Sequence, residues 1–189
     1  MTRHRDLALF TTAAVVVLAL DQLTKARVRS GLPPGGSWPS ADTTVGRFFS
    51  FTHVHNTGVA FGLFQGNSNV LLLVALVVVT SLLVYRQRMA STAVWPNLAL
   101  GMIVAGAAGN AIDRVRLGHV TDFLDFKFWP VFNVADTCIV CGVLLLSVHL
   151  WREDRARAGD PVVIPVEDVA RLAGAGRRAY DPGSGGADE

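Results

Sequence analysis

Four apolar blocks, separated by more polar segments, constrain the fold of this chain more than any other feature of its sequence. A helix needs roughly 17–25 mostly apolar residues to cross a bilayer, and with its flanking residues each block reaches this length or comes close to it. Only 17% of the residues are charged, whereas ordinary soluble domains carry about 25%. We therefore predict a membrane protein with an all-α core of four transmembrane helices, at residues of about 7–27, 68–86, 94–112 and 133–151.

The first apolar block raises the question of a cleavable signal peptide. Arg3 and Arg5, followed by a short apolar stretch, imitate such a signal, but the block runs into the stretch "DQLTK" (Asp21–Lys25) without a small-x-small cleavage pattern. We therefore expect the block to be retained as the first helix. Basic residues precede the first block, separate the second from the third and follow the fourth. Because basic residues favour the cytoplasmic side, both termini are expected in the cytoplasm.

Two segments, of about residues 30–67 and 113–132, then lie outside the membrane on the other side. The first contains "VGRFFSFTHVHNTGVAFGLF", in which β-branched and aromatic residues are interrupted by Asn-Thr-Gly, a pattern typical of short strands and a turn. We predict a small extracytoplasmic β-sheet on the outer membrane surface. Residues 1–158 then form one four-helix membrane domain, and the Gly-, Arg-, Asp- and Pro-rich residues 159–189 form a disordered cytoplasmic tail.

The third apolar block carries small residues at every fourth position, namely Gly101, Ala105 and Gly109. On a helix these residues lie on one face, and small residues allow a neighbouring helix to approach closely. This pattern predicts close helix packing along that face.

Aspartates at the edges of the apolar blocks are the candidates for chemistry. Ionisable groups in or beside a membrane span are costly and usually face a protein interior or a water-filled pocket. Asp21 precedes Lys25 by one helical turn, which predicts a local ion pair. Asp113 lies beside Arg114 at the end of the third block, where a charge neutralised at a helix end is the simplest interpretation.

Asp136 differs because no basic residue is near it in the chain. One interpretation is a capping role in the first turn of the fourth helix, where the helix dipole favours negative charge. The other is a partnership with Asp122 or Asp125, because the third and fourth helices form a hairpin that brings this segment back beside Asp136. Two carboxylates at close range share one proton and can act as general acid and base around a water molecule. The spacing leaves the choice between Asp122 and Asp125 open.

Several longer motifs extend this interpretation. They are "HNTGVAFGLF" (His55–Phe64), "GNAIDRVRLGHVTDFLDF" (Gly109–Phe126), "FNVADTCI" (Phe132–Ile139) and the "DQLTK" stretch. Together they resemble the bacterial lipoprotein signal peptidase family (signal peptidase II, or prolipoprotein signal peptidase), over about Ala8 to Trp151. Several motifs that agree in the same order are a specific signal, unlike a single short pattern.

The resemblance implies a membrane-embedded aspartic endopeptidase that removes signal peptides from prolipoproteins, cutting before a cysteine that carries a diacylglyceryl group. It implies that Asp122 and Asp136 are catalytic, which makes Asp125 a flanking residue. It also implies two further sets. Substrate-binding positions are Asn56, Asn110, Arg114 and Asn133, and supporting positions are Asp21, Lys25 and Asp113.

The same resemblance implies where the enzyme works and what it needs. It implies a multi-pass protein of the bacterial cytoplasmic (inner) membrane with its active site at the outer face. The expected partners are diacylglyceryl-modified prolipoproteins and membrane lipids, with no nucleic acid, and the enzyme is expected to be monomeric. No metal and no organic cofactor are expected.

The residues also suggest three alternative functions. Cys138 and Cys141 have the spacing of a thiol oxidoreductase, but the chain contains no second cysteine pair to pass electrons on. His53 and His55, with His119, suggest a metal site, yet they lack a Cys or acidic partner at zinc-like spacing. A small proton-coupled transporter would use buried aspartates, but here they gather at the outer ends of the spans instead of the midplane.

Overall fold

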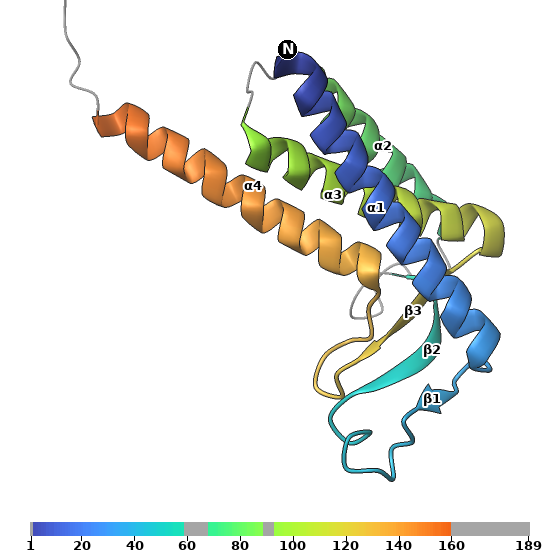
Figure 1. Cartoon of the computed structure of the whole chain (residues 1–189). Helices are drawn as coiled ribbons and strands as arrows, with labels where there is room; N and C mark the ends of the chain where they lie inside the picture. The colour runs from blue at the N-terminus through green and yellow to red at the C-terminus, as the bar shows by residue number, and fades with distance from the viewer. Residues whose placement is uncertain (1, 59–67, 89–92, 160–189) are drawn as a thin grey trace, which may run out of the picture. The chain divides into compact units, whose positions relative to one another are not determined.

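A computed structural model describes residues 2–58, 68–88 and 93–159 of the chain. The remaining residues, among them the tail from residue 160 and the second half of the "HNTGVAFGLF" motif, lie outside the described residues. The described residues form four helices, each apolar and long enough to cross a membrane (Figure 1). These are α1 (Thr2–Gly31), α2 (Ser68–Arg88), α3 (Val94–Leu117) and α4 (Val134–Gly159). The predicted four-helix core is confirmed.

All four helices end later in the chain than predicted, and α4 extends furthest, to Gly159. α1 continues to Gly31 and α3 to Leu117, past the polar residues that end each block. The charged residues near these helix ends do not break the helices, because Lys25 of α1 and Asp113 of α3 are both buried and pair with each other across the helix interface.

Helix α3 is the most buried of the four and packs against the others. Built onto Gly101, a Cβ would lie 2.7 Å from the carbonyl oxygen of Phe10, and one on Gly109 would overlap a carboxylate oxygen of Asp21. The face that carries the small residues therefore packs on α1, as predicted. Gly142 of α4 approaches α3 in the same way, since its Cβ would lie 2.8 Å from the carbonyl oxygen of Ala99.

Gly106 lies where α3 meets the start of α4, and no side chain fits there. A Cβ on Gly106 would lie 2.5 Å from the carbonyl oxygen of Ala135 and 2.8 Å from Cγ1 of Ile139. We expect Gly106→Ala to destabilise the fold by about 1–3 kcal/mol, the usual cost of overpacking, measured by thermal unfolding in detergent. Gly31→Ala is the matched control, because its Cβ would meet nothing within 4 Å. Equal unfolding temperatures for the two variants would contradict the close contact.

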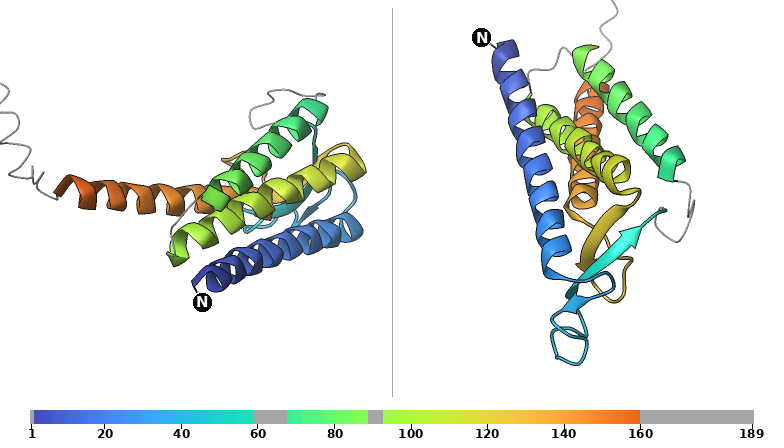
Figure 2. Two further views of the ribbon diagram at one scale, coloured as in Figure 1. Left: turned by 90° about the horizontal axis from the view of Figure 1, so that it is seen from above. Right: turned by 90° about the vertical axis from the view of Figure 1, so that its right-hand side faces the viewer.

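The sheet is antiparallel and has three strands in the order β1 (Ser37–Trp38), β2 (Ser50–Asn56) and β3 (Val120–Asp125). Figure 2 shows it beside the C-terminal part of α1. The sheet itself was predicted, but its third strand comes from the segment between α3 and α4, for which no strand was expected. Gly118, in the left-handed conformation with φ of 78°, ends α3, and β3 begins two residues later.

The chain turns back after β3 towards the fourth helix. Phe132 pairs with Leu124 in an isolated antiparallel bridge, and α4 begins shortly afterwards at Val134. This return brings the start of α4 beside the middle of β3, so residues of the two elements can share one site.

Candidate active site

Asp122 lies in the middle of β3 and is almost fully buried, with 2% of its surface exposed. Its side chain accepts two hydrogen bonds, from Nδ2 of Asn56 at 2.8 Å and from Nδ2 of Asn133 at 2.6 Å. Asn56 is at the end of β2, two positions beyond Val54, which pairs with Asp122 in the sheet register. Because alternate strand residues point to the same face, the register places Asn56 and Asp122 on one side of the sheet.

Asp136 lies in the first turn of α4 and takes part in the cap of that helix. Its carboxylate accepts the backbone N–H of Asn133 at 3.2 Å, and its own N–H donates to Oδ1 of Asn133 at 3.1 Å. This reciprocal pair is a capping box, which satisfies backbone donors at the helix start. The other carboxylate oxygen accepts Nδ2 of Asn110 at 2.7 Å. The capping interpretation of Asp136 is therefore confirmed, and it coexists with a second contact to α3.

Asn133 connects the two carboxylates. Its side-chain amide donates to Asp122 while its backbone N–H donates to Asp136. Among the described residues neither carboxylate forms an ion pair, although both lie near the buried Lys25. The site thus holds two acids that are surrounded by neutral amides and are not directly neutralised by a cation.

Burial raises the pKa of Asp122 to about 6, and the negative charge of Asp136 contributes to the increase. The hydrogen bonds from Asn56 and Asn133 oppose it, because they stabilise the ionised form. A carboxyl group with such a pKa can gain or lose a proton close to neutral pH, which suits acid–base chemistry.

Asp125 has a different environment. It accepts a hydrogen bond from Oγ1 of Thr52 at 2.7 Å and forms an ion pair with Lys127. Burial alone would raise the pKa of Asp125, but the bonds from Lys127 and Thr52 bring it below its ordinary value. Asp125 is therefore held as a stable anion away from Asp136, and the geometry favours Asp122 as the partner, a choice that spacing left open.

A buried cluster beside the two acids joins α1 to α3. The ammonium group of Lys25 lies 2.9 Å from the carboxylate of Asp21, 3.3 Å from that of Asp113 and 2.8 Å from Oδ1 of Asn110. We call these four residues the Lys25 cluster. The predicted Asp21–Lys25 ion pair is confirmed, and both side chains are fully buried.

The Lys25 cluster also reaches the site. Because Lys25 and Nδ2 of Asn133 both donate to Oδ1 of Asn110, the NH₂ end of that amide is turned to Asp136. Asp21 accepts the backbone N–H of Ala135 at 3.1 Å, at the start of α4. The Lys25 cluster therefore positions Asn110, which donates to Asp136, and also the start of α4, which carries Asp136.

Arg114 lies at the edge of the site without an ion pair to Asp113. Asp113 pairs instead with Lys25 and, at 3.7 Å, with Arg29. The guanidinium donates two long hydrogen bonds, 3.4 Å to the carbonyl oxygen of Asn110 and 3.5 Å to that of Gly58. Its buried Nε has no partner among the described residues. Arg114 thus has N–H donors that are available to another group.

The histidines and cysteines that suggested a metal site or a thiol oxidoreductase lie in two separate groups. The ring of His55 stacks on that of His119 at 3.8 Å and contacts that of His53 at 4.9 Å between centroids. In the part of the chain that the structure describes, no group of three or more His, Cys, Asp or Glu side chains is arranged to hold a metal ion. Cys138 and Cys141 are both free, and Cys141 is exposed.

Comparison with known proteins decides the family. The model of the family "Signal peptidase (SPase) II" matches residues 13–152. A lipoprotein signal peptidase of Moorella thermoacetica is 42% identical over 141 residues, which cover 75% of this chain and 91% of that protein. One of Mycobacterium avium is 42% identical over 150 residues, covering 76% and 79%.

This chain belongs to the signal peptidase II family. Two solved structures of bacterial membrane enzymes, both obtained by the in meso method, share its fold. One has a TM-score of 0.71 and 26% identity, covering 82% of this chain and 94% of that chain. The other has a TM-score of 0.65 and 30% identity, covering 75% and 91%. The protein is therefore a membrane peptidase of bacterial type, and the predicted family is confirmed.

One contributor to this signal peptidase II site was missed from the sequence. Arg29 donates to Oγ1 of Thr121 at 3.1 Å besides pairing with Asp113, and so attaches the end of α1 to β3. A signal was present, since Arg29 follows Lys25 by four residues and lies on the same helix face. Thr121 could not be found, because its pairing depends on the unpredicted strand.

Proposed function

We propose that this signal peptidase II removes signal peptides from prolipoproteins by aspartic catalysis, with Asp122 and Asp136 as the catalytic pair. The cut falls before the cysteine that carries the diacylglyceryl group. The observation that supports this most strongly is a pair of acids, Asp122 buried and Asp136 half-buried. They share Asn133 as a hydrogen-bond donor and form no ion pair among the described residues.

The chemistry follows from one shared proton. A water molecule held between the carboxylates loses a proton to the ionised acid while its oxygen attacks the carbonyl carbon of the scissile bond. The protonated acid donates to the carbonyl oxygen, and a proton then passes to the leaving amine as the C–N bond breaks. Asp122 can carry the shared proton, since its pKa is about 6.

The surrounding residues would hold the substrate without adding charge. Asn56, Asn110 and Asn133 each donate to one of the two acids, which keeps the carboxylates in place. The Nε of Arg114 has no partner in the part of the chain that the structure describes, and its terminal nitrogens form only long hydrogen bonds. Its guanidinium can therefore bind substrate carbonyl oxygens.

We place the enzyme in the bacterial inner membrane as a monomer, with both termini in the cytoplasm. Basic residues at the ends of the apolar blocks support this orientation. The sheet and the two acids then lie at the outer face, where the lipid-anchored cysteine of a substrate is within reach. The sheet helps to exclude bulk water from the acids.

The proposed function is tested with purified protein in detergent. A synthetic prolipoprotein peptide with a diacylglyceryl cysteine is incubated with the protein, and mass spectrometry locates the cut. We expect cleavage immediately before the modified cysteine and none of the same peptide with a free thiol. Absence of cleavage of the lipidated peptide under conditions where the protein stays folded would refute the proposal.

The pH dependence of cleavage tests the role of Asp122. Because the shared proton is lost as the pH rises through about 6, the pKa of Asp122, kcat/KM should fall above that pH. Asn56→Leu removes a hydrogen bond that stabilises the ionised carboxylate, so the pKa of Asp122 rises and the fall in kcat/KM moves to higher pH. The measurement is a pH profile of kcat/KM for both proteins.

His55 supplies the control for this profile. Burial and the neighbouring His119 lower the pKa of His55 from its ordinary value, and its imidazole is the other titratable group to be tested. We expect the fall in kcat/KM of His55→Gln, the descending limb of its pH profile, to occur at the same pH as in the wild-type protein. A limb that moves in His55→Gln and stays in Asn56→Leu would assign the titration to the histidines and not to Asp122.

A further inference from the structure

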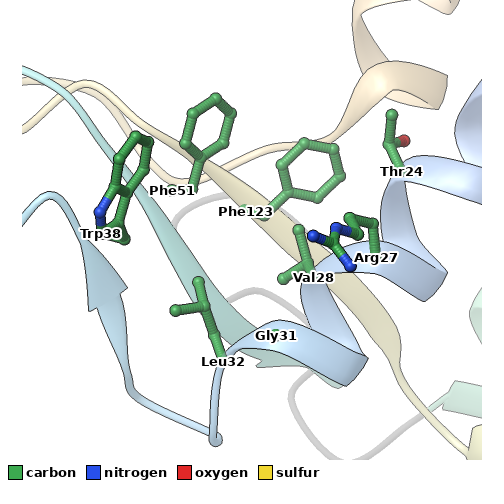
Figure 3. A pocket seen from close by; sticks show the side chains of 8 residues that line it. All are labelled: Thr24, Arg27, Val28, Gly31, Leu32, Trp38, Phe51 and Phe123. Carbon is green, nitrogen blue, oxygen red and sulfur yellow. The ribbon is translucent and has the colours of Figure 1, made fainter.

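A cavity of about 420 Å³ lies beside the sheet, against the last turns of α1. Figure 3 shows its lining, in which Phe51 and Phe123 of the sheet, with Trp38, face Val28 and Leu32 of the α1 end. Phe123 is adjacent to Asp122 in β3, and neighbouring strand residues point to opposite faces. The cavity is therefore on the other side of the sheet from the two acids and takes no part in the proposed cleavage.

The walls are mostly apolar. Arg27 contributes the only charged side chain among the described residues of the lining, and Figure 3 shows its guanidinium extended towards Val28 and Phe123. The hydroxyl of Thr24, the other polar side chain of the lining, already donates to the carbonyl oxygen of Leu20. Arg27 makes no side-chain hydrogen bond or ion pair with any described residue, whereas Arg29, two positions on, has two partners. A ligand that fits this lining is amphiphilic, with an apolar chain and a negative group.

The position of the cavity identifies the source of such a ligand. The candidate span of α1 runs from His4 to Gly31, so the lining residues of α1 lie at the end of that span, where lipid headgroups meet acyl chains. Leu20 and Leu23, just before them, are 51% and 68% exposed and can contact lipid tails. The size is also adequate, since small-molecule sites enclose roughly 300–1,000 Å³.

We propose that this cavity binds an anionic phospholipid of the bilayer. One acyl chain lies against Phe51, Phe123 and Leu32, and the phosphate accepts hydrogen bonds from the guanidinium of Arg27, whose planar fork matches a phosphate group. The bound lipid fills the gap between the end of α1 and the sheet and so steadies the sheet from the side opposite the acids. The proposal uses the membrane placement given above but not the peptidase chemistry.

The test compares two lipids with identical dioleoyl chains, phosphatidylglycerol and phosphatidylcholine, on the full-length protein in detergent. Native mass spectrometry measures the fraction of protein that retains each lipid. We expect the protein to retain phosphatidylglycerol roughly fivefold better, the factor given by one basic residue near an anionic headgroup. Arg27→Gln should abolish this preference, and Leu32→Trp, which fills the cavity, should lower retention of both lipids.

Arg116→Gln is the matched control, because Arg116 is an exposed arginine in the last turn of α3 that does not line the cavity. Equal retention of the two lipids by the wild-type protein, or an equal loss of preference in Arg27→Gln and Arg116→Gln, would overturn the proposal. If Leu32→Trp fails to fold, Arg27→Gln still decides the outcome. Asp136→Asn should keep the lipid preference, so a failure of the lipid site is distinguishable from a failure of the proposed catalysis.

Discussion

Asp122→Asn and Asp136→Asn are each expected to reduce cleavage of a lipidated peptide by roughly 10²–10⁴-fold, the contribution of a positioned general acid or base. An amide can neither take a proton from water nor donate one to the developing oxyanion. Both variants should still fold and insert, because asparagine has the same shape and each acid makes hydrogen bonds that are partly preserved by an amide oxygen. The measurement is initial rate per mole of folded protein in detergent.

Asp125→Asn is the matched control for these variants. It removes a carboxylate from the same strand, three residues from Asp122, but one that is paired with Lys127 and is held by Thr52. We expect this variant to keep a rate within a few-fold of the wild type. A rate above roughly one hundredth of the wild-type rate in Asp122→Asn or Asp136→Asn, or complete loss in Asp125→Asn, would remove the assignment of the catalytic pair.

The helices could be predicted because their signal is local. A block of apolar residues reports a membrane span through its own length and composition, and the Asp21–Lys25 pair follows from spacing within one helix. The charges within the helix ends were harder to interpret. Lys25 of α1 and Asp113 of α3 neutralise each other across the interface, so the helices continue past the ends of the blocks.

The third strand could not be predicted in the same way. Val120, Phe123 and Leu124 are good strand residues, but a strand forms only where an edge is available, and the edge belongs to β2 from a distant segment. The strand decides the site, because it fixes which of Asp122 and Asp125 faces the start of α4. Motif resemblance pointed to Asp122, which this geometry places beside the start of α4, but it did not reveal the strand that puts it there.

The side chain of Asn133 is a second example of a contact that the sequence could not predict. Its position before α4 is typical of a helix N-cap, and the structure contains that cap. The second bond, from its side-chain NH₂ to Asp122, depends on the return of the chain after β3 and has no signature within the motif. Local capping chemistry was therefore predictable, whereas the connection between the two acids was not.

Lys25→Met should have the largest effect on stability of any single change in the Lys25 cluster. The substitution keeps the length of the side chain but leaves the carboxylates of Asp21 and Asp113 buried without the ammonium group that lies 2.9 and 3.3 Å from them. Removing one partner of a buried charge pair costs about 3–5 kcal/mol, because the remaining charge is uncompensated. We expect a loss of this size in chemical or thermal unfolding in detergent.

Lys127→Met is the matched control for the loss of an ion pair. Lys127 pairs with Asp125 at a partly exposed position, and its side chain is 32% exposed. Such pairs contribute only about 0–1 kcal/mol to stability. Both variants lose an ion pair but only Lys25 is buried, so the difference between their stability losses measures the effect of burial. Similar losses in both variants would show that the Lys25 cluster is not the buried charge centre inferred from its contacts.

A second variant ties this stability effect to the site. Asp113 still pairs with Arg29 at 3.7 Å when Lys25 is lost, whereas Asp21 keeps no ion-pair partner among the described residues. Lys25→Met combined with Asp21→Asn removes this uncompensated charge, so we expect it to recover part of the lost stability. It should not recover cleavage in full, because Asn110 loses the charged one of the two donors that keep its NH₂ end turned to Asp136. If stability and cleavage recover together, Lys25 acts only on the fold. If stability recovers alone, Lys25 also orients the side-chain amide of Asn110 towards Asp136.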